Sequence, residues 1–421
     1  MTTMTNWLQS PGARLSLQNR WLVALLVGTA TLAAYGVLPF FYHRLGTPDA
    51  SYFNLMADAF LHGRLYLTDP PYTEDLTLHQ GRWYLAYLPL PALLMTPWAA
   101  IGGVGAVKTT LFVMLFGALN ASLVFLLLDG LARRGLTKLA RIDNLWLTLL
   151  FALGSVHWSV AIGGAVWYAS QICTVTFVAL AAWLAVERAP PWLVGAALAL
   201  AMAARPHVLL IWPLLLGATM MVADLAPKGE PIRWKRLLAW TIQSAIPVVA
   251  MLGLIMLYNH ARFGDPLDFG YATMNVGEVF KASLREYGQF NLHYLPKNFW
   301  AMWLAGPEWV EARNFWRPNL WGMSLLITTP ALVFLVRANR WSWLTAGAWT
   351  AFGLIMALLL LYSSTGYGQF GYRYSLDFMI PAMVLLAIGA GSRVPGLMRT
   401  LIVAGVLVNL AGVVWWMNGN P

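Results

Sequence analysis

The sequence is poor in charged residues and almost free of cysteine. Asp, Glu, Lys and Arg make up only 10% of its 421 residues, whereas an ordinary soluble domain has about 25%. The single cysteine, Cys173, excludes an internal disulfide and any cysteine-based metal cluster. The sequence also has no Walker-type phosphate loop, no His-x-x-Glu-His pattern and no Asp-x-Asp. It therefore indicates neither a nucleotide site nor a metal site.

Long apolar runs dominate the chain instead. Hydrophobic residues make up 59% of it, and the mean hydropathy is +0.62. Runs near 20 residues match the thickness of a bilayer core, and the 22 Trp and 16 Tyr suit interfacial belts. We expect an all-α polytopic membrane protein, with residues 1–421 forming a single integral membrane domain. The eleven expected spans are 21–42, 107–128, 144–163, 167–186, 191–205, 207–225, 237–258, 319–336, 343–362, 374–391 and 399–417.

Two apolar stretches need separate treatment. Arg14 and Arg20 precede the run 21–42, which is too long for the apolar region of a cleavable signal and should remain as the first membrane helix. The stretch 84–103 contains three prolines, and each proline bends a helix or removes one of its hydrogen bonds. We expect 84–103 to be re-entrant or to lie on the membrane surface.

The basic residues predict the topology. With 84–103 outside the span count, the positive-inside rule places the N-terminus in the cytoplasm and the C-terminus outside a cell inner membrane. The cytoplasmic side then carries the whole net charge of +10. Because these charges cluster in short loops between spans, they do not indicate a nucleic-acid partner. The basic loops are 133–141, 228–236, 337–340 and 392–399.

Two external loops, 43–106 after the first span and 259–318 after the seventh, are far longer than a minimal turn. Long ordered loops are usually functional. In the first loop, apolar residues from Ala50 onward recur at helical spacing and predict an amphipathic helix on the outer membrane surface. These apolar residues are Phe53, Met56, Ala57 and Phe60.

Acidic residues in the first loop have two readings. Asp49 follows Pro48 and precedes the expected helix, so it could cap that helix or act as a base at the membrane surface. Asp58 and His62 lie one turn apart and most simply form a solvated face.

Three basic residues near the external ends of spans also have two readings. Arg205 and His207 flank Pro206, where an arginine could snorkel to the surface or serve a function at membrane depth. Arg373 could pair with Asp377 four residues on, or its guanidinium could bind phosphate. The neighbouring tyrosines could stack on a sugar or form an interfacial belt.

Five elements of the sequence occur in the order found in a known family. They are PDASYFNLMADAFLHGRLYL, GRWYLAYLPLPALLMTP, AARPHVLLIWP, YNHARFGDPLDFGY and GYRYSLDFMIPA. In their order and topology they resemble the GT-C membrane glycosyltransferases, especially bacterial members of glycosyltransferase family 39. That family is related to protein O-mannosyltransferases and the lipid A aminoarabinose transferase.

The resemblance implies an enzyme that takes a sugar from a polyprenyl-phosphate carrier and passes it, with inversion, to an external acceptor. Its partners would be the lipid-linked donor, membrane lipid and a glycan, lipid or protein acceptor. The catalytic acid of the family's first loop maps to Asp49. The other candidates are Arg205, His207, Arg262 and Arg373 for the donor phosphate, and Tyr52, Asp58, His62, Glu74, Asp75 and Tyr372 for acceptor or sugar contacts.

The sequence departs from the family at three places. Many relatives have tandem acids where this chain has Asp49-Ala50, and a second acid where it has GGAVWYASQ at 163–171. A basic residue often found before the proline-rich stretch is replaced by Tyr87-Leu88. No cofactor is identified, and dependence on a divalent metal stays open.

Two other classes of protein compete with this interpretation. A lipid or sugar transporter or flippase would place polar residues and interrupted helices near mid-depth. A non-catalytic membrane assembly subunit would need no aligned acid and arginines. The charge-poor centres of the spans and the long external loops favour surface chemistry.

Overall fold

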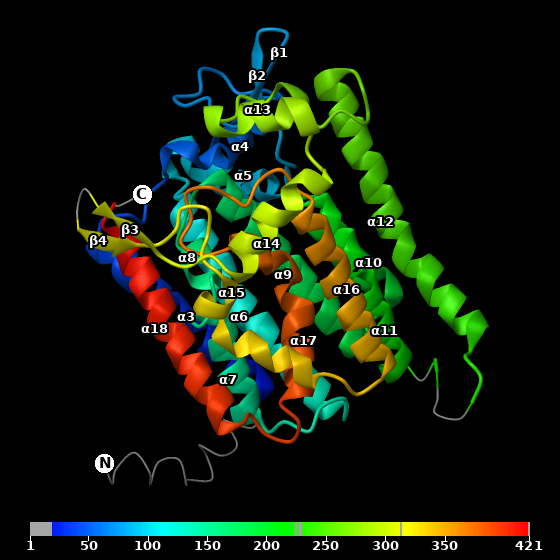
Figure 1. The fold of residues 1–421 in the computed structure, drawn as a ribbon. Coiled ribbons are helices and arrows are strands. Elements are labelled where there is room, and N and C mark those ends of the chain that lie inside the picture. Colours follow the sequence, from blue (N-terminus) through cyan, green and yellow to red (C-terminus); the bar gives the residue numbers. More distant parts are fainter. Residues whose placement is uncertain (1–18, 224, 227–229, 312–313, 420–421) are drawn as a thin grey trace.

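The computed structural model describes residues 19–223, 225–226, 230–311 and 314–419 and is mostly helical (Figure 1). In these residues, six helices are long and apolar enough to cross a membrane, since about 20 residues span a bilayer core. The chain is therefore a multi-pass membrane protein. The six helices are α3 (Arg20–Phe41), α6 (Thr109–Arg133), α9 (Val166–Val186), α12 (Trp234–Phe263), α16 (Trp343–Leu360) and α18 (Gly396–Met417).

The other expected spans form shorter helices, several of them interrupted. Pro206 and Pro330 begin 3₁₀ segments, labelled η, where proline cannot continue the α-helical hydrogen bonding. The count of eleven crossings consequently stays a prediction. The shorter elements are α7 (Arg141–Ala152), α8 (His157–Ala161), α10 (Pro191–Met202), η3 (Pro206–Ile211), α11 (Trp212–Val222), α15 (Leu325–Thr328), η7 (Pro330–Arg337), η8 (Arg373–Phe378) and α17 (Met379–Gly389).

Ion pairs gather basic segments at one end of the bundle, which lies at the bottom of Figure 1. Glu187, just after α9, pairs with arginines from α3 and from the end of α6. Asp129 of α6 pairs with Arg141 of α7, and Asp143 pairs with Arg399 of α18. We call this the basic end. Its cytoplasmic orientation remains a prediction.

The first external loop leaves the bundle and returns to it at one place. The hydroxyl of Thr47 donates to the carbonyl of Val107 at 2.7 Å, and the amide of Thr110 donates to the carbonyl of Gly46 at 3.1 Å. The intervening elements are η1 (Asp49–Ser51), α4 (Phe53–Leu61), β1 (Leu76–His79), β2 (Arg82–Leu85), α5 (Leu90–Gly102) and η2 (Val104–Ala106).

Two expectations for this loop can be compared with the structure. Helix α5 has 13 residues, or about 20 Å at 1.5 Å per residue, so it is shorter than a bilayer core. The absence of a crossing at 84–103 stays a prediction. The expected surface helix is α4, which starts at Phe53 rather than Ala50 and buries Phe53, Met56 and Ala57 in the protein core. These apolar residues pack within the protein and do not face lipid.

The second loop begins after Phe263, because α12 continues for 30 residues. Asn275 exchanges backbone hydrogen bonds with Asp75 and Leu76, so the two loops form one external layer. Helix α13 lies in this layer, below the β1–β2 hairpin at the top of the molecule (Figure 1). The elements of the second loop are η4 (Tyr271–Thr273), α13 (Glu278–Tyr287), η5 (Leu292–Tyr294), α14 (Leu295–Trp303), β3 (Glu308–Val310) and β4 (Phe315–Arg317).

Candidate functional site

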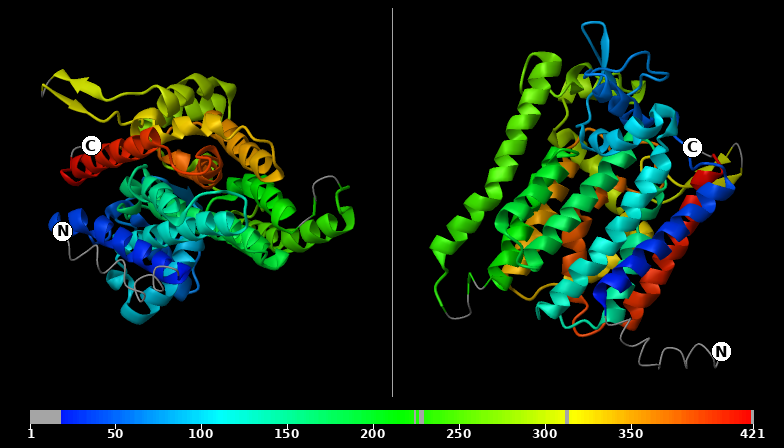
Figure 2. Two further views of the ribbon diagram at one scale, coloured as in Figure 1. Left: turned by 90° about the horizontal axis from the view of Figure 1, so that it is seen from below. Right: turned by 180° about the vertical axis from the view of Figure 1, so that it is seen from behind.

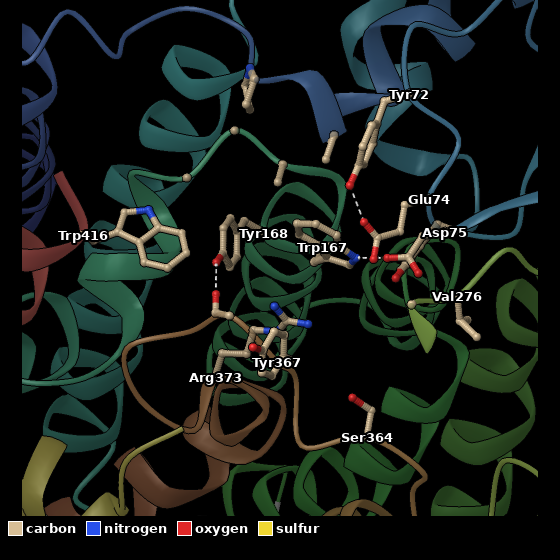
Figure 3. Close-up of a pocket in the computed structure, with 18 of the residues that line it drawn as sticks. Tyr72, Glu74, Asp75, Trp167, Tyr168, Val276, Ser364, Tyr367, Arg373 and Trp416 are labelled. Carbon is tan, nitrogen blue, oxygen red and sulfur yellow. Dashed lines mark hydrogen bonds between the residues drawn. The ribbon is translucent and has the colours of Figure 1, made fainter. Parts of the chain in front are cut away.

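A cavity of about 910 Å³ lies beneath this external layer (Figure 3). Both long loops line it, together with the turn between α8 and α9 and the loop between α16 and η8. These segments are distant in sequence, so the cavity exists only in the folded chain. Its polar and aromatic lining includes Tyr72, Glu74, Asp75, Trp167, Tyr168, Gln289, Tyr367 and Arg373.

Arg373 lies at the wall of this cavity with no acidic partner. Its side chain is buried, and its guanidinium carbon lies 5.7, 5.6 and 5.1 Å from the ring centroids of Trp167, Tyr168 and Tyr374. Within the described residues no carboxylate forms a salt bridge with it, and its Nε has no hydrogen-bond partner. A buried cation without a counter-charge is unfavourable. The site is therefore suited to an anion.

Asp377 pairs with Arg205 and His207. Its fully buried carboxylate accepts hydrogen bonds from Arg205 at 2.8 Å, His207 Nε2 at 3.0 Å and Gln171 at 3.2 Å. The alternative of an Arg373–Asp377 pair is therefore wrong. Arg205 and His207 line a second cavity of about 250 Å³, and Arg373 lines both cavities.

Glu74 and Asp75 form the acidic wall of the main cavity (Figure 3). The indole N–H of Trp167 donates to the Asp75 carboxylate at 2.7 Å. Burial raises the pKa of Asp75, and nearby Glu74 adds to this, whereas Trp167 and Arg373 oppose it. The hydroxyl of Tyr72 donates to Glu74, which raises the pKa of Tyr72 to about 12.

Asp49 is exposed and lies beside the same cavity. Its neighbours Pro48 and Ala50 line the cavity, whereas Asp49 does not. The residues that precede η1 and α4 are Pro48 and Tyr52, and neither helix has a side-chain cap. The capping interpretation of Asp49 is therefore wrong, and its catalytic role stays a proposal.

Arg262 lies outside both cavities and bonds to protein atoms. It donates to the carbonyl of Leu85 at 2.6 Å and to the side chain of Asn259 at 2.7 Å, and it stacks on Tyr258 at 4.0 Å. These contacts hold the end of α12 against β2. The geometry gives no support to a phosphate-binding role for Arg262.

The remaining predicted residues lie away from the cavity centre. Asp58 lies near His62 at 3.6 Å and Arg64 at 3.5 Å on the exposed side of α4, as a solvated face would. Tyr52 is buried and donates to the backbone carbonyl of Glu74 at 2.7 Å. Tyr372 is also buried and lines neither cavity.

The sequence reasoning missed Trp167, Tyr168 and Gln171, which lie in a segment noted only for lacking an acid. A signal was present in the Gly-Gly pair before them. A Cβ on Gly163 would lie 2.2 Å from the Tyr168 ring, so the chain needs glycine there to bring this ring to the cavity. Residues 366–371, GYGQFG, have the spacing of a dinucleotide loop, but no strand leads into them and that context is required.

A possible metal site was also considered. In the part of the chain that the structure describes, no group of three or more His, Cys, Asp or Glu side chains is arranged to hold a metal ion. Dependence on a divalent metal is not decided by this geometry, since Glu74 and Asp75 could act with oxygen atoms from a substrate.

No protein-family model matches the sequence, and no curated protein matches it. Two solved structures are similar in fold. ArnT from Cupriavidus metallidurans, bound to undecaprenyl phosphate, has a TM-score of 0.50 and 15% identity, over 86% of this chain and 59% of that one. The Archaeoglobus fulgidus oligosaccharyltransferase in the apo form has a TM-score of 0.46 and 13% identity, over 94% and 55%.

This chain thus spans well under two thirds of either neighbour's length. The likeness to ArnT, a lipid A aminoarabinose transferase, concerns the fold and shows that the chain has the GT-C architecture expected from its motifs.

Proposed function

We propose that this chain is a membrane glycosyltransferase that transfers a sugar from a polyprenyl-phosphate donor to an acceptor at the external face, with inversion. The observation that carries the proposal is the pair of opposed walls in the main cavity. Arg373, a buried cation without a carboxylate partner, lies on one wall, and Glu74 and Asp75 lie on the other. Glycosyl transfer to a hydroxyl needs a base on one side and positive charge beside the departing phosphate.

The donor is assigned to the Arg373 side. The second cavity joins the polar groups of Arg205, His207 and Arg373 to apolar walls. A lipid phosphate combines the same two characters, and a guanidinium suits phosphate geometry. The similar fold of ArnT was solved with undecaprenyl phosphate, which supports this donor class. The apolar lining of the second cavity includes Leu88, Phe290, Leu358 and Leu359.

The acceptor is assigned to the carboxylate side. Its oxygen attacks the anomeric carbon while the bond from that carbon to the phosphate oxygen breaks. The acceptor proton passes to a carboxylate, and the bond electrons leave with the phosphate, whose charge Arg373 stabilises. Attack from the face opposite the leaving phosphate inverts the configuration, as the opposed walls favour.

Two carboxylates are candidates for the base. Asp49 matches the family acid and is exposed at the cavity edge, where an acceptor can reach it. Asp75 lines the cavity, and burial raises its pKa, which strengthens a carboxylate as a base. We retain Asp49 as the first candidate and place Asp75 as its competitor.

The structure has one of the two features that a transporter would need and lacks the other. Interrupted helices are present, so this feature no longer separates the classes. The polar groups of both cavities, however, lie towards one end of the bundle. That position favours chemistry at a surface, and we assign the active site to the outer face of a bacterial inner membrane.

A transfer assay in lipid nanodiscs tests the proposal. A radiolabelled polyprenyl-phosphate sugar is supplied with glycan, lipid or peptide acceptors, and both sugar release and donor binding are measured. Arg373→Gln should lower donor use by about 10- to 150-fold, the effect of losing a charge-assisted hydrogen bond of about 1.5–3 kcal/mol. The melting temperature of Arg373→Gln, measured in parallel, separates a loss of donor contacts from a loss of folding.

Arg285→Gln on the exposed side of α13 is the matched control and should leave donor use unchanged. Donor binding without any sugar release would instead support a flippase or an assembly subunit. Donor binding that is equally strong in Arg373→Gln would overturn the donor assignment.

A further inference from the structure

Residues 290–311 and 314–317 of the second external loop present apolar side chains outward. Around α14, Leu292 is 73% exposed, Leu304 62%, Phe299 44% and Trp300 40%. The opposite face is buried against the bundle through Asn298, Ala301 and Met302. Water would be an unfavourable neighbour for such a face, although the segment lies in a loop that was expected to be external.

The hairpin β3–β4 continues this apolar surface. Trp309 lies opposite Trp316, with ring centroids 5.4 Å apart, and the two side chains are 45% and 63% exposed. The hairpin projects sideways beyond the helices (Figure 2). No third strand extends it in the described ranges. An isolated two-stranded hairpin is only marginally stable in water, so this hairpin needs a further partner.

The segment lies at the external end of a membrane span. The side-chain amide of Asn298 donates to the carbonyls of Leu359, Leu360 and Tyr362, at 3.1, 3.0 and 2.6 Å. These carbonyls mark the end of α16, an apolar helix long enough to span a membrane. The exposed apolar side chains of α14 therefore lie on a helix that is fastened to the end of a candidate span.

Lys297, the one lysine of α14, lies apart from the apolar face of this helix. Lys297 points to the external layer, with its ammonium nitrogen 3.6 Å from the centroid of the Trp321 ring. Burial lowers the pKa of Lys297. An apolar face beside a basic polar edge is typical of helices that lie in a membrane interface, and Trp is enriched at that depth.

We propose that residues 290–311 and 314–317, named here the interfacial segment, lie in the boundary between head groups and acyl chains of the outer leaflet. The partner is a lipid surface, and the hairpin tryptophans act as its outermost anchors. This inference needs no part of the proposed enzymatic function. If that function is granted, one consequence follows: Phe290 lines the second cavity, so the donor cavity borders the interfacial segment.

Site-directed fluorescence in nanodiscs tests the proposal. In a Cys173→Ala background, single cysteines replace Phe299, Trp316 or, as the control on exposed α13, Arg285. Each is labelled with an environment-sensitive nitrobenzoxadiazole probe. Phosphatidylcholine with a nitroxide near its head group should quench the probes at 299 and 316 several-fold more than the probe at 285. Aqueous iodide should give the reverse order.

Three results would overturn the proposal. One is equal quenching of all three probes by iodide, which would place the segment in water. Another is protection of 299 and 316 from both quenchers together with disulfide cross-linking between two Trp316→Cys chains, which would identify a second copy as the partner. The last is an unchanged lipid response when Trp309→Ser is added to the 316 probe, which would remove the tryptophans' anchoring role. Donor binding, measured in parallel, reports separately on the proposed function.

Discussion

The two ends of the helical bundle treat arginine differently. At the basic end each arginine of the cluster has a carboxylate partner, whereas Arg373 at the cavity end has none among the described residues. Arg205 also lies at the cavity end, yet Asp377 neutralises it. Pairing with Asp377 therefore separates Arg205, which helps to hold the fold, from Arg373 better than depth in the membrane does. The paired arginines of the basic end are Arg20, Arg133, Arg134, Arg141 and Arg399.

The largest expected effect concerns the two candidate bases, Asp49 and Asp75. Replacing the catalytic base by asparagine should lower turnover by about 10²–10⁴-fold, the usual contribution of a positioned base. Asp49→Asn and Asp75→Asn are compared by single-turnover kinetics with saturating donor. If only Asp49→Asn is impaired, the family assignment holds. If only Asp75→Asn is impaired, the base is the cavity carboxylate, and normal rates in both variants would overturn both assignments of the base.

The pH dependence of stability separates the same two residues. Because burial raises the pKa of Asp75, its ionised form disfavours the folded state. Parent stability should fall as pH rises through this elevated pKa. Asp75→Asn should then melt above the parent at neutral pH, and the difference should disappear below the ordinary carboxyl pKa of about 3.9. Melting curves that never diverge would show that this burial has no energetic consequence.

The next effect is on folding rather than turnover. Asp377→Asn leaves the buried Arg205 without its counter-charge, and breaking a buried pair costs about 3–5 kcal/mol. Chemical denaturation in detergent measures the loss. Asp58→Asn is the control, because Asp58 is partly exposed to solvent and such pairs contribute about 0–1 kcal/mol. Equal losses of unfolding free energy in both variants would show that a buried ion pair matters no more to this fold than an exposed one.

A smaller effect is expected when lysine replaces Arg373, because the positive charge is kept but the planar guanidinium is lost. Arg373→Lys should retain part of the donor use that Arg373→Gln loses, with kcat/KM down about tenfold, since one charge-assisted hydrogen bond is lost. Initial rates over a range of donor concentrations give this value. A lysine variant as inactive as the glutamine variant would show that guanidinium shape matters more than charge.

The smallest effect belongs to the basic end. Three arginines form ion pairs with Glu187, but their side chains are 24–39% exposed. Glu187→Gln should destabilise the protein by about 1 kcal/mol, with a smaller difference at high salt and no change in donor use. Thermal melting at low and high salt checks this. A selective loss of donor binding in Glu187→Gln would show that the basic end is coupled to the donor site, contrary to this prediction.

Hydrophobic runs made much of the fold predictable. The cores of all six long helices lie within expected spans, because a bilayer needs about 20 apolar residues whatever the neighbouring helices do. The basic loops at 133–141 and 392–399 were also expected to share a side, and ion pairs join them to one end. The GT-C architecture followed from the order of the motifs.

The pairing of charges could not be predicted from the sequence. Asp377 is four residues from Arg373, but it bonds with Arg205, 172 residues away, because the packing of distant helices decides which partner is reached. Trp167 gave no acidic or basic signal, yet it lies between the two walls of the cavity. The exposed apolar face of α14 was hidden in the sequence because its exposed residues are interleaved with buried ones.

The closed base of the first external loop has a further consequence for evolution and engineering. Hydrogen bonds from Thr47 and Thr110 fasten its two ends together, so a replacement segment with the same end spacing would leave and enter the bundle at the same place. Its buried face must still fit the core, because Phe53, Met56 and Leu76 pack there. Under these two conditions the loop could be exchanged as a unit. Grafting the 48–106 segment of another GT-C protein between Thr47 and Val107 would alter one wall of the cavity while leaving Arg373 in place. Lineages could thereby acquire new acceptors by exchanging one loop on an unchanged membrane scaffold.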